Sequence, residues 1–209
     1  LLLTAGVMHE QRRGGTMPGA NAPDGRPHAE NLDTVRIDGG LVGRFLTPGS
    51  RVVALRASGV TQRHDRVFGS VHEQNHSGTW FGESSITGTT GAHTWVGGAA
   101  IQRDTFRSTQ VPRFNFAYTV PGVFLQDDYT VSPRVTISAS GHLDHHSEFG
   151  TFLSPRVSAL FRPAEQITAR VSGGQGHFAP LPFTDETDAT GLTPVARLGA
   201  LEPEHANSV

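Results

Sequence analysis

Residues 120–163 read VPGVFLQDDYTVSPRVTISASGHLDHHSEFGTFLSPRVSALFRP, and they decide the fold class because three runs within them alternate between apolar and polar side chains. In the middle run, apolar residues such as Val135 and Leu143 stand at odd positions and polar residues at even positions. This period of two predicts a β-strand with one apolar face. A minimal turn at 132–133 and a longer polar loop at 145–154 join the three runs. Unequal connections of this kind are typical of an up-and-down sheet whose two ends face different surroundings.

The same alternation runs through most of the chain and predicts about ten strands. Tight turns are expected near Pro48, Gly91, Pro133 and Pro163, and every long connection is expected at the opposite ends of the strands. A soluble sandwich or propeller gives no reason to gather all long loops at one end, whereas outer-membrane barrels do so. The sequence therefore predicts an all-β fold, an antiparallel up-and-down transmembrane β-barrel segment with about ten strands of a larger barrel.

Four aromatic residues on the apolar strand faces lie close to the predicted tight turns. They are Phe45, Trp95, Tyr129 and Phe161. Aromatic rings are favoured at the membrane interface, where barrels carry them as a girdle, so we expect these four to form one ring around the short-turn end. The alternative is that strands contain aromatic residues for their β-propensity alone. Asp127 interrupts the same apolar face.

Composition excludes several classes of function. The 209 residues include 25 Gly and 13 Pro, which favours turns over long helices. The sequence contains no run of about 18 apolar residues, so no transmembrane helix is predicted. A formal net charge of -2 gives no basic surplus for nucleic acid. The absence of Cys excludes disulfides, thiolate metal sites and thiol catalysis. The chain has no nucleophile elbow and no phosphate-binding Gly loop with Lys, so we predict neither an enzyme nor a cofactor.

The segment 142–146, HLDHH, holds the most suggestive polar cluster. His142, Asp144 and His146 lie on one strand face and could offer imidazole and carboxylate ligands to zinc or iron. The alternative, which we favour, is a polar barrel wall near the loop end, because such spacing is common on strands and no second cluster is obvious. A separate polar stretch, interpreted as a solvated loop, holds His64, His72 and His76. The acidic run 183–191 lacks the ligand spacing of a calcium loop and is also interpreted as loop.

Four short motifs follow one another in the second half of the chain. They are FLQDDY at 124–129, SPRVSALFRP at 154–163, GHFAP at 176–180 and LEPE at 201–204. In order and spacing they resemble the β-barrel of TonB-dependent outer-membrane receptors, in which a GHFAP-like segment opens a long external loop and an LEPE-like segment precedes the next strand. The resemblance covers residues 120–209, and the first half of the chain is supported mainly by its alternation. Phe178 stands where the family usually has Arg, so a role of that arginine in loop anchoring or ligand contact is not carried over.

The resemblance implies a receptor that binds a scarce ligand at its external face and imports it with energy from the inner membrane. Ferric siderophores, cobalamin and other metal chelates are the implied ligands, and outer-membrane lipid and the TonB system are the implied partners. We expect residues 1–209 to form part of one barrel domain, with the plug and the TonB-contacting segment upstream and the final strands downstream. Such a piece is expected not to close alone, because open strand edges are not tolerated in lipid.

The candidate ligand-binding residues follow from the alternation, which places them on the barrel lumen near the loop end or at the base of a loop. They are Gln102, Asp104, His142, Asp144, His146, His177 and Phe178. Two rival interpretations remain. A passive porin or an adhesin barrel shares the alternation and the unequal connections but needs no plug. A soluble extracellular β domain that binds carbohydrate or protein would stay monodisperse without detergent.

Overall fold

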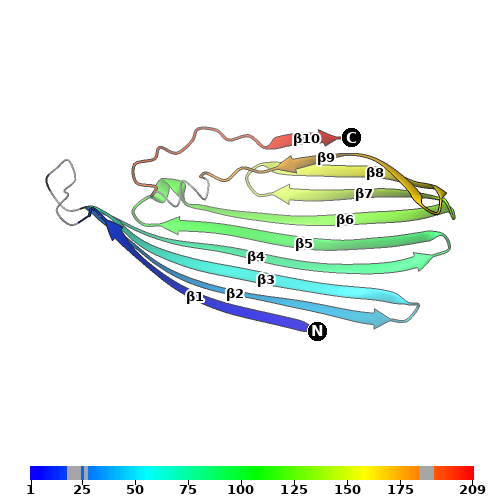
Figure 1. The fold of residues 1–209 in the computed structure, drawn as a ribbon, viewed down its shortest axis with the longest axis horizontal. Helices are drawn as coiled ribbons and strands as arrows, with labels where there is room; N and C mark the ends of the chain where they lie inside the picture. The colour runs from blue at the N-terminus through cyan, green and yellow to red at the C-terminus, as the bar shows by residue number, and fades with distance from the viewer. Residues whose placement is uncertain (18–24, 26–27, 184–190) are drawn as a thin grey trace.

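The chain forms one antiparallel ten-stranded sheet in the computed structural model (Figure 1). The structure describes residues 1–17, 25, 28–183 and 191–209. The strands are β1 (Leu2–Gly15), β2 (Ala29–Thr47), β3 (Arg51–Phe68), β4 (Val71–Thr90), β5 (His93–Ser108), β6 (Phe116–Ser132), β7 (Val135–His146), β8 (Gly150–Ala164), β9 (Ile167–Phe178) and β10 (Glu204–Ser208). Spatial order follows chain order, so each strand pairs only with its sequence neighbours. The prediction of an all-β up-and-down sheet is confirmed.

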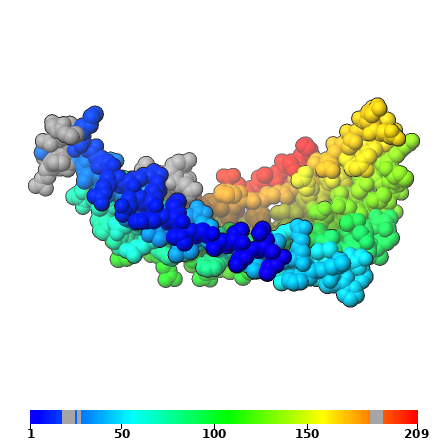
Figure 2. Space-filling view, turned by 60° about the horizontal axis from the view of Figure 1, so that its bottom comes forward, coloured from blue at the N-terminus to red at the C-terminus, as the bar shows by residue number. Residues whose placement is uncertain are grey.

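The sheet is curved rather than flat, as Figure 2 shows, and β1 and β10 are its two described edges. A single 3-10 turn, η1 (Pro112–Phe114), interrupts the connection between β5 and β6. No helix within the described residues is long and apolar enough to cross a membrane.

The two faces of the sheet differ in chemistry because side chains alternate along every strand. We call the face that carries Glu73, Phe106 and Tyr118 the inner face, and the opposite face the outer face. Aliphatic side chains on the outer face remain strongly exposed, with Leu125 at 62% and Val157 at 56%. An apolar surface of this extent is built to be covered by another apolar phase.

The outer apolar band is bordered by one tryptophan at each side. Trp95 lies near the short-turn end of β5, and Trp80 on β4 pairs with Arg103 on β5. Residue 103 lies eight positions after residue 95, which is about 27 Å along the strand at about 3.4 Å per residue. In a barrel with a strand tilt of about 40°, this distance is about 20 Å along the barrel axis. Transmembrane barrels carry an apolar band about 25 Å tall, so the spacing fits a membrane-spanning wall.

The predicted aromatic residues occupy the short-turn side of the outer face. Phe45, Tyr129 and Phe161 are about half exposed there, at 52%, 41% and 49%. Asp127, which interrupts the apolar face, pairs with Trp95 across the strands and so lies at this same border. Its Oδ2 hydrogen-bonds to His93 Nδ1 at 2.7 Å, and the His93 ring stacks on Tyr129. The carboxylate therefore sits at the rim of the band with a polar partner.

The prediction that every long connection lies at one end of the strands is confirmed by the β1–β2, β5–β6 and β9–β10 connections, but two of the connections at that end are short. The four tight turns are confirmed, but β3 and β4 are joined at the opposite end by Gly69 and Ser70 alone, and the predicted loop 145–154 shrinks to residues 147–149. A two-residue hairpin needs positive φ, which Gly69 adopts at 59°. The pairing of β3 with β4 therefore continues through the polar stretch to Phe68 and Val71.

The interpretation of His64, His72 and His76 as loop residues is therefore wrong, because all three lie in β3 or β4. Their polarity marks strands that extend beyond the apolar band rather than a loop. The acidic run 183–191 is not assessed, since residues 184–190 lie outside the described part of the chain.

Candidate functional site

An inner-face cavity of about 620 Å³ lies toward the long-loop ends of the strands. Side chains of β3, β4 and β5 give it a polar floor, β6 and β7 add aromatic rings, and residues 178–183 pass over it. Small-molecule sites in proteins commonly measure about 300–1,000 Å³ and combine apolar walls with a few polar groups. Both the volume and the mixed lining fit that description.

Asp104 is the acidic group of the cavity floor. Its Oδ2 accepts a hydrogen bond from Gln102 Nε2 at 2.7 Å, and its Oδ1 accepts one from Thr79 Oγ1 at 2.7 Å. Thr79, Asp104 and Tyr118 are cross-strand partners on β4, β5 and β6, so the register itself places them side by side. The carboxylate is therefore fixed in position before any ligand arrives.

His146 forms the aromatic side of the cavity together with two rings. It is 6% exposed and packs on Tyr118 and Phe149 at centroid distances of 4.9 Å each. Its Nδ1 accepts hydrogen bonds from the backbone N–H groups of Glu148 and Phe149. The outer-face residues at this level, His145 and Thr151, are polar, so His146 lies beyond the apolar band. Burial lowers the pKa of His146 below its ordinary value, so the ring is neutral at pH 7.

His177 faces the inner surface from the end of β9. Its ring stacks on Phe152 at 4.2 Å with an interplanar angle of 12°, and Ser154 Oγ lies 3.2 Å from His177 Nδ1. The β8–β9 register runs from Ala164 and Ile167 to Arg156 and Gly174. His177 therefore lies beyond the regular pairing with β8, although it still pairs with His205 of β10.

Five of the seven candidate residues from the sequence line this one cavity. They are Gln102, Asp104, His146, His177 and Phe178. Phe178 does so only at the rim, since 62% of its surface is exposed. The other two, His142 and Asp144, do not line the cavity. His142 Nδ1 lies 3.0 Å from Asp144 Oδ1, and the His142 ring stacks on Phe124.

The three side chains of the HLDHH segment that could have bound a metal ion do not converge on one point. His142, Asp144 and His146 do share the inner face, but His142 binds Asp144 while His146 is turned against Tyr118. Within the described residues, no group of three or more His, Asp or Glu side chains is placed to hold a metal ion.

Two charged residues clamp the segment 191–195, which belongs to the connection between β9 and β10. Glu73 on β4 is 1% exposed, and its two carboxylate oxygens accept hydrogen bonds from the backbone N–H groups of Leu192 at 3.0 Å and Thr193 at 2.6 Å. Arg113 of η1 donates to the carbonyl oxygens of Leu192, Thr193 and Val195 at 2.9, 2.7 and 2.9 Å. One residue therefore holds the N–H side of this segment and the other holds its carbonyl side.

The clamp closes over a small apolar cluster. Its fully buried members come from β5, the β5–β6 connection and the clamped segment, and they are Phe106, Val111, Phe114 and Leu192. Phe116, Phe183 and Val195 pack against them. Figure 1 shows the β9–β10 connection reaching back to η1. The clamp and the cluster together fix the loop that borders the cavity.

Sequence reasoning missed this clamp because its partners lie far apart along the chain. Glu73 and Leu192 are separated by 119 positions, and neither stands in a recognisable motif. Glu73 lies between the outer-face residues His72 and Gln74, beyond the apolar band. Burial raises the pKa of Glu73, but the hydrogen bonds from Thr193 and Leu192 and the charge of Arg66 outweigh it, so the pKa is lower than usual.

A sequence profile described as "TonB dependent receptor-like, beta-barrel" matches residues 12–209. The chain belongs to the TonB-dependent receptor β-barrel family. This confirms the resemblance carried by the four motifs. The family consists of outer-membrane receptors and transporters rather than enzymes. No curated protein sequence matches the chain.

Solved structures confirm the receptor-barrel fold. The siderophore receptor PirA from Pseudomonas aeruginosa is similar with a TM-score of 0.65 and 16% identity, over 74% of this chain and 29% of that chain. PirA from Acinetobacter baumannii is similar with a TM-score of 0.52 and 12% identity, over 75% of this chain and 26% of that chain. The chain thus spans less than a third of either receptor.

The TonB-receptor motifs occupy the expected places in the sheet. FLQDDY lies within β6, GHFAP runs from the end of β9 into the following connection, and LEPE leads into β10. The rim pair of Asp127 with His93 comes from the first of these motifs. The last two motifs therefore mark where one strand leaves the sheet and the next enters it.

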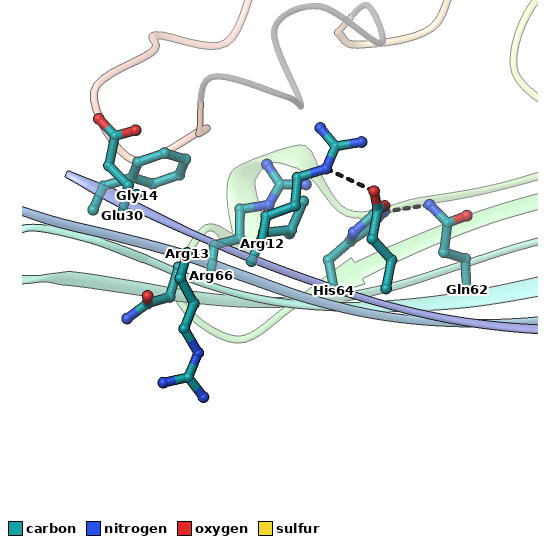
Figure 3. Close-up of a pocket in the computed structure, with 11 residues that line it drawn as sticks. Arg12, Arg13, Gly14, Glu30, Gln62, His64 and Arg66 are labelled. Atoms are coloured by element: carbon teal, nitrogen blue, oxygen red, sulfur yellow. Dashed lines mark hydrogen bonds and ion pairs between the residues drawn. The ribbon is translucent and has the colours of Figure 1, made fainter.

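A second inner-face cavity of about 550 Å³ lies beside β1, β2 and β3 (Figure 3). Arg12 Nε donates to Glu10 Oε1 at 2.6 Å, and Gln62 hydrogen-bonds to His64. Arg66, which is 2% exposed, also lines this cavity and stands opposite Glu73 in the β3–β4 register. Two arginines of this second cavity therefore lie beside carboxylates, since Arg12 is paired with Glu10 and Arg66 stands opposite Glu73.

Proposed function

We propose that the receptor barrel containing this chain takes up a metal chelate, such as a ferric siderophore or cobalamin, across the bacterial outer membrane. The observation that carries the proposal is the inner-face cavity of about 620 Å³, which opens at the long-loop end and is lined by five residues chosen from sequence alone. Siderophore receptors named PirA share the fold, which supports this ligand class. The outer apolar band then contacts outer-membrane lipid.

The chemistry of the cavity suits a large ligand that carries both rings and polar donors. His177 offers a ring surface, which gains about 0.5–1.5 kcal/mol from a well-placed aromatic partner. Asp104 offers a fixed acceptor for hydroxyl or amide groups of the ligand. In this proposal no bond is broken, and the energy for release comes from the TonB system, contacted through the N-terminal part of the complete receptor.

The test uses the full-length receptor in a strain that lacks its own siderophore receptors. Uptake of radioactive iron from a panel of ferric siderophores, with and without a protonophore, should show import of at least one chelate that stops when the inner membrane is de-energised. Transport that continues with the protonophore contradicts the proposal and favours a passive porin. A protein that stays in the soluble fraction without detergent contradicts the membrane assignment altogether.

Two matched variants link uptake to the cavity. His177→Ala removes a stacked ring from the cavity wall, while His142→Ala removes a similarly stacked ring outside it. We expect His177→Ala to weaken chelate binding about tenfold, since one ring contact contributes up to about 1.5 kcal/mol, and His142→Ala to leave binding unchanged. Equal effects of both substitutions would show that the chelate binds elsewhere.

A further inference from the structure

The outer face carries a row of basic side chains beyond the apolar band. Arg63 on β3 pairs with His76 on β4, and His76 pairs with Arg107 on β5, so the three are direct neighbours across three strands. All three are exposed. Adjacent strands lie about 4.8 Å apart, which places the backbones of the two arginines about 10 Å apart with His76 between them. An anion above His76 is within reach of both guanidinium groups.

Acidic neighbours do not neutralise this row. Asp33 and Asp65 lie one step further from the band on the same face, and each is held by other partners. His9 and Gln11 contact Asp33 at 3.2 and 2.9 Å. His72 and Gln74 contact Asp65 at 2.6 Å each. Burial raises the pKa of Asp65, but its hydrogen bonds with His72 and Gln74 and, to a smaller extent, the charge of Arg63 lower the pKa overall.

Arg63 and Arg107 have no ion-pair partner in the part of the chain that the structure describes. Arg103 lies nearer the band, opposite Trp80, and donates to Thr119 Oγ1 at 3.2 Å. Exposed arginines that are left unpaired on a crowded polar face keep their full charge available for a ligand.

The position of the row matches the level of lipid headgroups. Trp80, which is 60% exposed, marks the border of the apolar band, as interfacial tryptophans do. Arg107 lies four positions beyond Arg103 along β5, which is about 14 Å along the strand and about 10 Å along the axis of a barrel whose strands tilt by about 40°. Arg103 thus lies at the border and the Arg63–His76–Arg107 row about 10 Å outside it.

We propose that Arg63, His76 and Arg107, with Arg103 below them, bind the phosphate of a phosphorylated lipid headgroup in the leaflet on the long-loop side. Arginine matches phosphate because its planar fork donates two parallel hydrogen bonds. The charge of the row and its height above Trp80 favour a membrane lipid over a soluble anion, because a lipid also covers the apolar band below. The inference does not depend on which ligand the inner face transports.

The test measures lipid binding to the full-length receptor in non-ionic detergent by native mass spectrometry. The probe is lipid A with both phosphates, compared with the same glycolipid after removal of its phosphates. The double variant R63Q/R107Q should bind the phosphorylated lipid about 30-fold more weakly, since each basic residue near a charged membrane surface contributes about a factor of five. Binding of the dephosphorylated lipid should be weak and equal in all variants.

The control is R134Q/R162Q, which removes the same charge from exposed arginines at the short-turn end and should leave binding unchanged. Heat-modifiable migration verifies that both double variants are folded. Equal loss in the two double variants, or equal binding of both forms of the lipid, overturns the proposal. Complete displacement of the lipid by excess inorganic phosphate overturns it as well, because the row would then be a simple anion site.

Discussion

The clamp on the segment 191–195 gives the sharpest prediction, because it depends on one buried carboxylate. Glu73→Gln keeps the size of the side chain but removes its charge and one acceptor. The two N–H groups of Leu192 and Thr193 then face an amide that can accept from only one of them.

The magnitude follows from the two hydrogen bonds. Hydrogen bonds to a charged group contribute about 1.5–3 kcal/mol each, or about 3–6 kcal/mol for the pair, and the glutamine recovers about 1 kcal/mol through one neutral bond. The expected loss is therefore about 2–5 kcal/mol of loop docking, which is roughly a 30- to 4,000-fold rise in the open population.

Hydrogen exchange of the Leu192 and Thr193 amides in the full-length receptor measures this opening directly. Glu83→Gln is the matched control, because Glu83 lies on the same strand and face but forms a partly exposed ion pair with Arg56 at 2.7 Å. Such a pair contributes about 0–1 kcal/mol and does not touch the loop. Protection that stays within twofold of the wild-type value in Glu73→Gln, or that falls equally in Glu83→Gln, would refute the clamp.

Three further predictions concern the same loop and the outer face. Because the pKa of Glu73 is lowered in the folded state, its contribution to docking is complete above the ordinary value of 4.5 and is lost as the pH falls below it. The protection factor of the Leu192 amide, which is its exchange rate corrected for the intrinsic rate at each pH, should be constant near neutrality and fall steeply in acid, and a fall between pH 8 and 6 would contradict this. Phe114→Ala empties a fully buried site and should cost about 3–5 kcal/mol of local stability, seen as proteolysis within 191–195. A Cβ at Gly59 would come within 2.6 Å of the Trp80 ring, so Gly59→Ala should shift Trp80 fluorescence and lower the thermal midpoint, while Gly141→Ala, with nothing within 4 Å, should do neither.

The strand pattern could be predicted from sequence because both faces of this sheet obey one rule over long runs. Alternation in residues 120–163 gave the period, and the tight turns near Pro48 and Pro133 gave the direction of each strand. The alternation also placed Gln102, Asp104 and His146 on the inner face, and all three line the cavity, which His177 and Phe178 reach from the base of a loop.

The errors arose where polar sequence was equated with loop. His64 and His72 are polar because their strands continue beyond the apolar band, and the turn between them needs only Gly69 and Ser70. Alternation alone could not reveal that the strands continue, since a strand that is exposed to solvent on both faces has no apolar side. Contacts such as that of Glu73 with Leu192 were equally hidden, because they depend on how loops fold back over the sheet.

The central claim is that the outer face meets lipid while the inner face lines an aqueous site. The chain contains no Cys, so single cysteines introduced along β5 from 95 to 107 can each carry a spin label in lipid vesicles, once any Cys elsewhere in the full-length receptor is replaced by Ser. Collision with oxygen and with a water-soluble nickel reagent should alternate with a period of two between Trp95 and Ile101, with oxygen favoured at odd positions, and water access should appear on both faces from Arg103 onward. Uniform water access from Trp95 to Ile101, without alternation, would contradict the account.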